Sequence, residues 1–149
     1  MSDQRKVVGG IPARYGSSRL PGKILKELAG KTMIQWVYER ALRSQTLSEL
    51  YVAVDDVRVQ QCVEGFGGKA IMTGSHHQSG TDRIAEAIAG RPADIIVNIQ
   101  GDQPLLDPRM IDEAVQPMLD RPEIKMSTLK MQIPPEDYDN PSVVKVVTD

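Results

Sequence analysis

Apolar and polar residues follow one another in blocks that predict strands and helices in turn. Short continuous apolar runs, typical of buried strands, occur at residues 6–11, 50–54, 69–72 and 94–99. The segments between them carry apolar residues at the three- and four-residue spacing of amphipathic helices, which predicts helices over 33–44, 56–66, 81–89 and 108–119. Two more strand-like runs follow at 126–133 and 143–147.

Capping and turn residues support these boundaries. Asp55 or Asp56 can cap the second helix, and the glycines at 67–68 stop it. Pro108 occupies a favoured position in the first turn of the last helix. Alternating strands and helices with continuous Val/Ile runs predict an α/β fold, in which helices cover both faces of a mostly parallel sheet.

The bulk composition fits one domain and excludes several classes of protein. The 149 residues carry 18 basic and 20 acidic side chains and 4% aromatics, unlike proteins held to nucleic acid by charge or by stacking. The chain has no apolar stretch of membrane-spanning length and a polar start unlike a signal peptide. The single cysteine, Cys62, reads as an apolar filler on a helix. We therefore expect a soluble cytoplasmic protein with no nucleic-acid or membrane partner.

The loop after the first strand, residues 11–23, carries the strongest chemical signal. It contains three cations and two glycines: Arg14, Arg19, Lys23, Gly16 and Gly22. Cations and free backbone amides at a strand end suit a polyphosphate, although an ordinary solvated turn is the alternative. No acidic residue lies between Arg5 and Glu27 to neutralise the cations, which favours phosphate binding. The loop is neither a Walker loop nor a Gly-x-Gly-x-x-Gly motif.

Asp102 follows the strongest predicted strand, in the segment 98–104. A single exposed carboxylate can hold Mg²⁺, which takes its remaining ligands from water and substrate phosphates. Alone, Asp102 would more often be a turn former or helix cap. Because the phosphate loop is expected on the same edge of the sheet, we favour the metal role.

A third polar segment, residues 73–83, also lies between a strand and a helix. The adjacent His76 and His77 do not share a face of a helix or strand, and the sequence has no third histidine, so we do not expect a zinc site. Small polar groups in this density suit a hydroxylated small molecule, with Arg83 for a carboxylate. Ser79 or Thr81 is expected to cap the following helix.

These three polar segments describe a nucleotide site with an adjoining acceptor site. The sequence shows no Ser/His/Asp set or carboxylate pair for covalent catalysis. Direct displacement at phosphorus, with cations and Mg²⁺ neutralising the developing charge, fits the residues.

At these residues the chain resembles the 3-deoxy-D-manno-octulosonate (Kdo) cytidylyltransferase family, the CMP-Kdo synthetases. The resemblance covers essentially the whole chain and is carried by residues 11–23 (IPARYGSSRLPGK), 30–40 (GKTMIQWVYER), 77–81 (HQSGT), 97–102 (VNIQGD) and 140–147 (NPSVVKVV). It implies a Rossmann-like α/β/α sandwich of the nucleotide-diphospho-sugar transferase type. It also implies the transfer of a cytidylyl group from CTP to Kdo, with release of pyrophosphate, for lipopolysaccharide biosynthesis.

The resemblance assigns roles to individual residues. It implies that Arg14 and Lys23 grip the CTP phosphates and that Asp102 binds Mg²⁺. The remaining implied contacts are nearby phosphate contacts from Ser17 and Arg19, cytosine contacts from the backbone of Pro12 and Ala13, and sugar or nucleotide contacts from Gln78, Arg83 and Gln100.

Two positions and the length depart from the family. Gln103 stands where the family commonly has Glu, and Gly74 where it often has Arg. Family members are longer, so we expect residues 1–149 to be a nucleotidyltransferase domain, the N-terminal portion of an enzyme that is a homodimer at full length. The alternatives are a CMP-sialic acid synthetase and a non-catalytic nucleotide-binding module.

Overall fold

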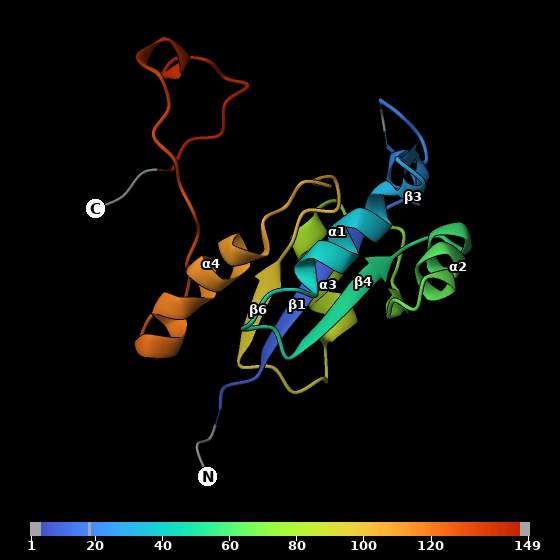
Figure 1. Cartoon of the computed structure of the whole chain (residues 1–149), viewed down its shortest axis with the longest axis horizontal. Helices are drawn as coiled ribbons and strands as arrows, with labels where there is room; N and C mark the ends of the chain where they lie inside the picture. Colours follow the sequence, from blue (N-terminus) through green and yellow to red (C-terminus); the bar gives the residue numbers. More distant parts are fainter. Residues whose placement is uncertain (1–3, 18, 147–149) are drawn as a thin grey trace.

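The computed structural model of the chain describes residues 4–17 and 19–146. Its centre is a four-stranded, fully parallel sheet with strand order β5–β4–β1–β6 (Figure 1). The strands are β1 (Val7–Ala13), β4 (Glu49–Val54), β5 (Ala70–Met72) and β6 (Ile95–Asn98). The predicted α/β class and parallel sheet are therefore confirmed.

Helices cover both faces of the sheet, as predicted. They are α1 (Met33–Ala41), α2 (Val57–Gly65), α3 (Gly80–Ile88) and α4 (Pro108–Asp120). Helices α1, α2 and α4 lie on one face of the sheet and α3 on the other (Figure 1). The larger core joins the sheet to α1, α2 and α4, and on the opposite face Val8 packs against Ile84 and Ile88 of α3. Successive residues of β1 point to opposite faces, so Val7 and Val8 belong to different cores.

The caps confirm two of the alternatives left open by the sequence. Asp56, not Asp55, caps α2 through the amide of Arg58, and Ser79, not Thr81, caps α3 through the amide of Asp82. Pro108 occupies the first turn of α4, as predicted.

The strand order creates a crevice at one edge of the sheet. The chain leaves β1 through α1 toward β4 on one side, and β6 pairs with the other side of β1. In open parallel sheets, ligands bind at the carboxyl ends of the strands where the order reverses in this way. The loops after β1 and β6 meet at this point.

Several expectations about local structure were wrong. Helix α1 ends at Ala41 rather than near residue 44, because Asp112 of α4 accepts the amides of Gln45 and Thr46 and draws the chain out of the helix. The structure also contains elements that were not predicted: the short 3₁₀ helix η1 (Lys23–Leu25) and the hairpin of β2 (Glu27–Leu28) and β3 (Lys31–Thr32).

The predicted strands at 126–133 and 143–147 are also absent from the described residues, and residue 147 lies outside them. A strand needs a partner for its backbone hydrogen bonds, and no described strand pairs with either segment. The C-terminal segment instead runs away from the sheet (Figure 1), with a 3₁₀ turn, η2 (Pro135–Asp137). Met126, at the start of the first of these two segments, is 86% exposed. No helix among the described residues is long and apolar enough to cross a bilayer.

Candidate functional site

A cleft of about 290 Å³ opens at the carboxyl edge of the sheet, where the loop after β1, the segment before α3 and the loop after β6 converge. The three polar segments singled out in the sequence therefore meet in space. Eight of the residues predicted for the site line this cleft: Pro12, Arg14, Ser17, Lys23, Gln78, Arg83, Gln100 and Asp102. Two do not line it. Ala13 is buried, and the exposed Arg19 lies outside the lining.

An ion pair crosses the cleft. Nζ of Lys23 lies 3.0 Å from Oδ2 of Asp102, and the two side chains are 40% and 51% exposed. An exposed pair of this kind contributes about 0–1 kcal/mol to stability, so it can open at little cost. Both charges are therefore available to a ligand.

Gly101 allows the two halves of the cleft to approach. A Cβ atom at this position would lie 3.1 Å from the carbonyl oxygen of Pro12 and 3.4 Å from Cγ2 of Ile11. Since both neighbours belong to β1, a side chain at 101 would push the loop after β6 away from the first loop. The absence of a side chain at Gly101 therefore allows the loop after β6 to lie close enough for Asp102 to contact Lys23.

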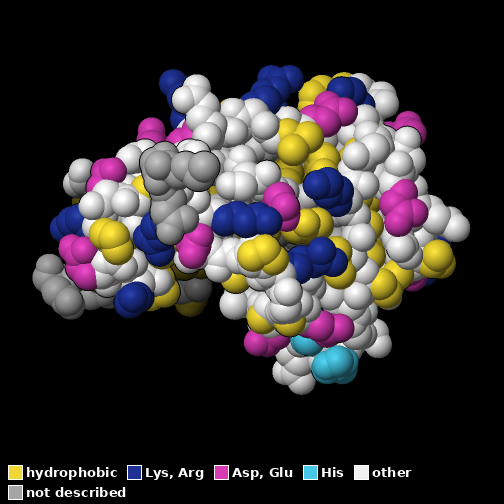
Figure 2. All heavy atoms as spheres, turned by 90° about the horizontal axis from the view of Figure 1, so that it is seen from below, with side chains coloured by type: hydrophobic (Ala, Val, Ile, Leu, Met, Phe, Trp, Pro, Cys, Tyr) yellow, Lys and Arg dark blue, Asp and Glu magenta, His cyan; other side chains and the backbone are white. Residues whose placement is uncertain are grey.

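Arg14 contributes a cation to the cleft wall. It is exposed, and no hydrogen bond or ion pair joins it to another residue within 4–17 or 19–146. With Lys23 it supplies two positive charges to one cavity. Across the face seen in Figure 2, by contrast, basic and acidic side chains are interspersed.

Tyr15 braces the first loop. Its amide donates to Oδ1 of Asp55 (3.0 Å), and its ring lies 3.5 Å from the guanidinium carbon of Arg58. Its carbonyl accepts the amide of Gly22 (2.9 Å), so the expectation that this amide is free for a phosphate was wrong. The loop holds its shape through this internal bond, and its side chains provide the positive charge.

Arg58 in turn holds Asp56 in its capping conformation. Hydrogen bonds from its guanidinium, and then from its backbone amide, lower the pKa of Asp56 to about 2. The carboxylate is therefore ionised at neutral pH, as a helix cap requires.

Arg83 reaches the cleft but is already engaged. Its guanidinium donates to Oδ2 of Asp55 (3.1 Å), to Oγ1 of Thr73 (2.8 Å) and to the carbonyl of Gly74 (3.2 Å). The side chains of Arg83 and Asp55 are only 4% and 13% exposed. A free guanidinium for a substrate carboxylate was expected, and the structure gives Arg83 buried partners instead.

Sequence reasoning missed the role of Asp55. One carboxylate oxygen holds the amide of Tyr15 in the first loop, and the other holds Arg83 of α3. Asp55 therefore connects the two walls of the cleft. The sequence signal that could have identified Asp55 is its position at the end of β4, next to the helix cap Asp56.

The two glutamines of the predicted site differ in their contacts. Nε2 of Gln100 donates to Oδ1 of Asn98 (3.3 Å), the last residue of β6. Gln78 is exposed, and within the described part of the chain it has no hydrogen-bond partner. Its side chain remains available to a ligand in the cleft.

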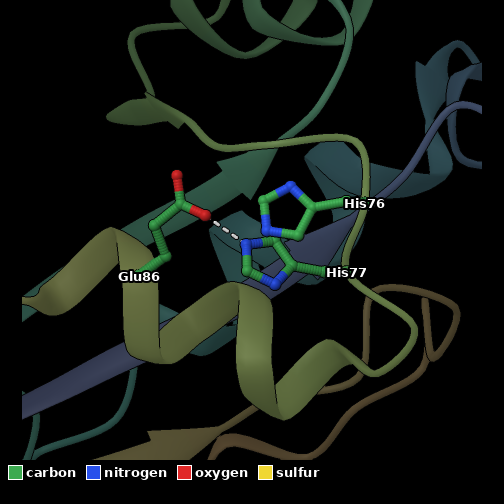
Figure 3. A group of neighbouring side chains, drawn as sticks. All are labelled: His76, His77 and Glu86. Carbon is green, nitrogen blue, oxygen red and sulfur yellow. Dashed lines mark hydrogen bonds and ion pairs between the residues drawn. The ribbon is translucent and has the colours of Figure 1, made fainter.

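His76 and His77 do not behave as the sequence analysis expected. They lie in a loop, where face periodicity does not apply, and their rings are 4.4 Å apart between centroids. Glu86 of α3 completes the group, and His77 Nε2 contacts Glu86 Oε2 (Figure 3). The reason given for excluding a zinc site was therefore wrong.

Glu86 is held in its ionised form. The hydrogen bond from His77, and then that from the amide of Gly74, lower the pKa of its carboxyl below the ordinary value. The amide of Gly74 lies 3.1 and 3.3 Å from the two carboxylate oxygens.

Sequence comparison relates the chain to known proteins. The sequence profile of the family described as cytidylyltransferase matches residues 9–149. The chain is 53% identical over 145 residues to the 3-deoxy-manno-octulosonate cytidylyltransferase of Trichlorobacter lovleyi, covering 97% of this chain. It is 51% identical over 144 residues to the Escherichia coli protein of the same name. The chain spans 58% of the length of each of these curated relatives.

Solved structures give the same result. A structure described as CMP:2-keto-3-deoxy-manno-octonic acid synthetase complexed with CTP superimposes with a TM-score of 0.78 at 55% identity, over 80% of this chain and 49% of that one. A nucleotidyl transferase from Methanothermobacter superimposes with a TM-score of 0.65 at 18% identity, over 74% of this chain and 57% of that one, which supports the fold alone.

Proposed function

Because the chain belongs to the cytidylyltransferase family, we propose that its cleft binds CTP with Mg²⁺ and transfers the cytidylyl group to 3-deoxy-manno-octulosonate, releasing pyrophosphate. The observation that carries the proposal is the convergence of Arg14, Lys23 and Asp102 in one cleft at the carboxyl edge of the sheet. The relatives more than 50% identical that bear the name of this reaction support the choice of substrate.

The first loop would hold the phosphates. In this proposal Arg14 and Lys23 bind the triphosphate oxygens, with Ser17 and Arg19 at the entrance and the backbone at Pro12 and Ala13 toward the cytosine. Lys23 is released for this role when its exposed pair with Asp102 opens. The two cations then stabilise charge that grows on the transferring and departing phosphates.

The cleft also fits a magnesium ion. Asp102 is half-exposed, ionic and next to the proposed phosphate site, and it supplies one carboxylate oxygen where Mg²⁺ uses one or two plus substrate phosphates and water. When bound there, Mg²⁺ supplies Lewis-acid polarisation of the phosphate oxygens.

The residues of the chain would contribute position and charge rather than a covalent intermediate. The attacking anomeric hydroxyl of the sugar would lie in line with the leaving pyrophosphate, near Gln78 and Gln100. Arg83 would act as a positioning residue, because its guanidinium is bound to Asp55, Thr73 and Gly74. Holding two substrates in this geometry can lower a barrier by about 7–11 kcal/mol.

The proposal extends to the biological setting implied by the reaction: lipopolysaccharide precursor synthesis in the cytoplasm, by a homodimer when the protein is as long as its relatives. Residues 1–149 would serve as its nucleotide-binding domain.

Two experiments test the proposal. Calorimetric titration of the chain with CTP and Mg²⁺ is expected to show one site per chain. Incubation with CTP, Mg²⁺ and either Kdo or sialic acid is expected to release pyrophosphate with Kdo. Release with sialic acid alone would identify a CMP-sialic acid synthetase, and CTP binding without release from either sugar would identify a non-catalytic nucleotide-binding module.

A further inference from the structure

Three potential metal ligands converge beside the cleft. His76 and His77 come from the loop after β5, and Glu86 comes from α3 (Figure 3). Their ligand atoms all lie within 4.8 Å of one another. In Figure 2 the histidine side chains reach the surface at the lower edge of the face shown.

Gly74 prepares this group in two ways. Its amide donates to both carboxylate oxygens of Glu86 and fixes their direction toward the histidines. A Cβ atom at 74 would lie 2.4 Å from Cε1 and 2.5 Å from Nδ1 of His76. A side chain at this position would therefore displace the His76 ring from the group.

We propose that His76, His77 and Glu86 bind a divalent transition-metal ion, Zn²⁺ foremost. The bound ion links the loop after β5 to α3. Two imidazoles and one carboxylate form a set that Zn²⁺ uses in proteins, with a fourth position left for water or a further ligand. Mg²⁺ and Ca²⁺ prefer oxygen ligands, so the two histidines select against both.

The geometry needs only a small adjustment to close around an ion. Metal–ligand bonds of 2.0–2.2 Å place the ligand atoms of a tetrahedral site about 3.4 Å apart. The His76 side chain is exposed and can rotate toward the ion without disturbing the core. Glu86 is already oriented by a backbone amide, an arrangement that supports metal ligands in known sites.

The bound ion would restrain one wall of the cleft. His77 lines the cleft, and the next residues, Gln78 and Ser79, line it as well. An ion that joins His77 to Glu86 fixes this segment against α3. The site is separate from the magnesium position proposed at Asp102 and does not depend on the proposed function.

The composition makes the proposal easy to test. His76 and His77 are the only histidines in the sequence, and Cys62 is its only cysteine. Untagged protein is titrated with Zn²⁺ by calorimetry and with Co²⁺ by visible absorption. We expect one ion per chain, the intense absorption of tetrahedral Co²⁺, and a rise in melting temperature with Zn²⁺.

Matched variants locate the ion. His76→Ala, Glu86→Gln and Gly74→Ala are each expected to weaken Zn²⁺ binding tenfold or more, the last through displacement of His76. Glu64→Gln removes the same charge from an exposed position on α2, and Asp102→Asn removes the carboxylate of the other site. Both are expected to keep the Zn²⁺ affinity and the Co²⁺ spectrum.

The outcomes decide the matter whichever variants fold. Circular dichroism identifies the folded variants. Because His76→Ala alters only an exposed side chain, its Zn²⁺ affinity still tests the proposal if Glu86→Gln does not fold. Absence of binding, equal binding by His76→Ala and the parent chain, or loss of binding in Asp102→Asn would each overturn the proposal. None of these results bears on CTP binding at the first loop.

Discussion

The ammonium of Lys23 lies 3.0 Å from the carboxylate of Asp102, although 79 positions separate the two residues in the chain. The contact exists because β1 and β6 are neighbours in the sheet and both loops leave its carboxyl edge. The cation of one loop and the acid of the other therefore face the same cleft.

Replacing Lys23 tests the phosphate grip. Lys23→Ala is expected to weaken CTP binding by about 2 kcal/mol, roughly 30-fold, because it removes a charged hydrogen bond to a phosphate. Calorimetry with CTP measures the change. Lys26→Ala, an exposed lysine three residues on, is the matched control and is expected to bind CTP normally. Equal CTP affinity in the Lys23→Ala and Lys26→Ala variants would show that Lys23 does not bind the phosphates.

The buried pair of Arg83 and Asp55 predicts a stability effect. Arg83→Met leaves the Asp55 carboxylate buried without its partner, which costs about 3–5 kcal/mol. Arg109→Met breaks a pair whose arginine side chain is 81% exposed and is expected to change stability little, because solvent screens the pair. Urea unfolding compares the two, and similar losses would show that the Arg83 pair is not a structural connection.

Asp112 predicts a dependence of stability on pH. Burial alone would raise its pKa, but hydrogen bonds from Ser44, Thr46 and the amides of Gln45 and Thr46 hold it below the ordinary value. The stabilisation is therefore fully present above pH 3.8, the ordinary value, and is lost as the pH falls through the lowered pKa of the folded state.

Asp112→Asn is accordingly expected to be less stable than the parent at pH 7, with the difference shrinking in acid. The free energy of unfolding across pH 2–7 measures this. Asp120→Asn, on the same helix, is the control and is expected to show little difference. A gap between Asp112→Asn and the parent that stays constant down to pH 2 would contradict the assignment.

Alanine substitutions at Gly101 and Gly65 are expected to have opposite effects on stability. Gly101→Ala places a Cβ atom 3.1 Å from the backbone oxygen of Pro12 and is expected to cost about 1–3 kcal/mol of stability, and to weaken CTP binding in the presence of Mg²⁺. Gly65→Ala, at the end of α2 with no atom within 4 Å of the new Cβ, is expected to gain about 0.5–1 kcal/mol. Thermal unfolding measures both, and a stabilising Gly101→Ala would show that the loop is not tightly placed.

The sequence predicted most of the fold because local patterns determine it. Continuous apolar runs located the four sheet strands, and the predicted helices agree with α2, α3 and α4 to within about two residues. The hairpin of β2 and β3 was missed because two-residue strands leave no periodic pattern. The runs at 126–133 and 143–147 resemble strands, but a strand also requires a neighbour, which a local pattern cannot supply.

The candidate site was predicted in part for the same reason. Loops at strand ends pointed to Arg14, Lys23 and Asp102, which the structure brings together. Connections between distant segments were not visible, so the pairing of Asp55 with Arg83 and the approach of Glu86 to the histidines were missed. Both depend on how α3 packs against the sheet, and spacing along the chain does not encode that packing.

Calorimetric titration of CTP into the parent chain and into Asp102→Asn, each with and without Mg²⁺, tests the magnesium-dependent nucleotide site. The parent is expected to bind CTP more tightly when Mg²⁺ is present. Asp102→Asn is expected to bind CTP through the first loop but to gain nothing from Mg²⁺. If Mg²⁺ strengthens CTP binding equally in both proteins, Asp102 does not hold the metal and the proposed site is contradicted.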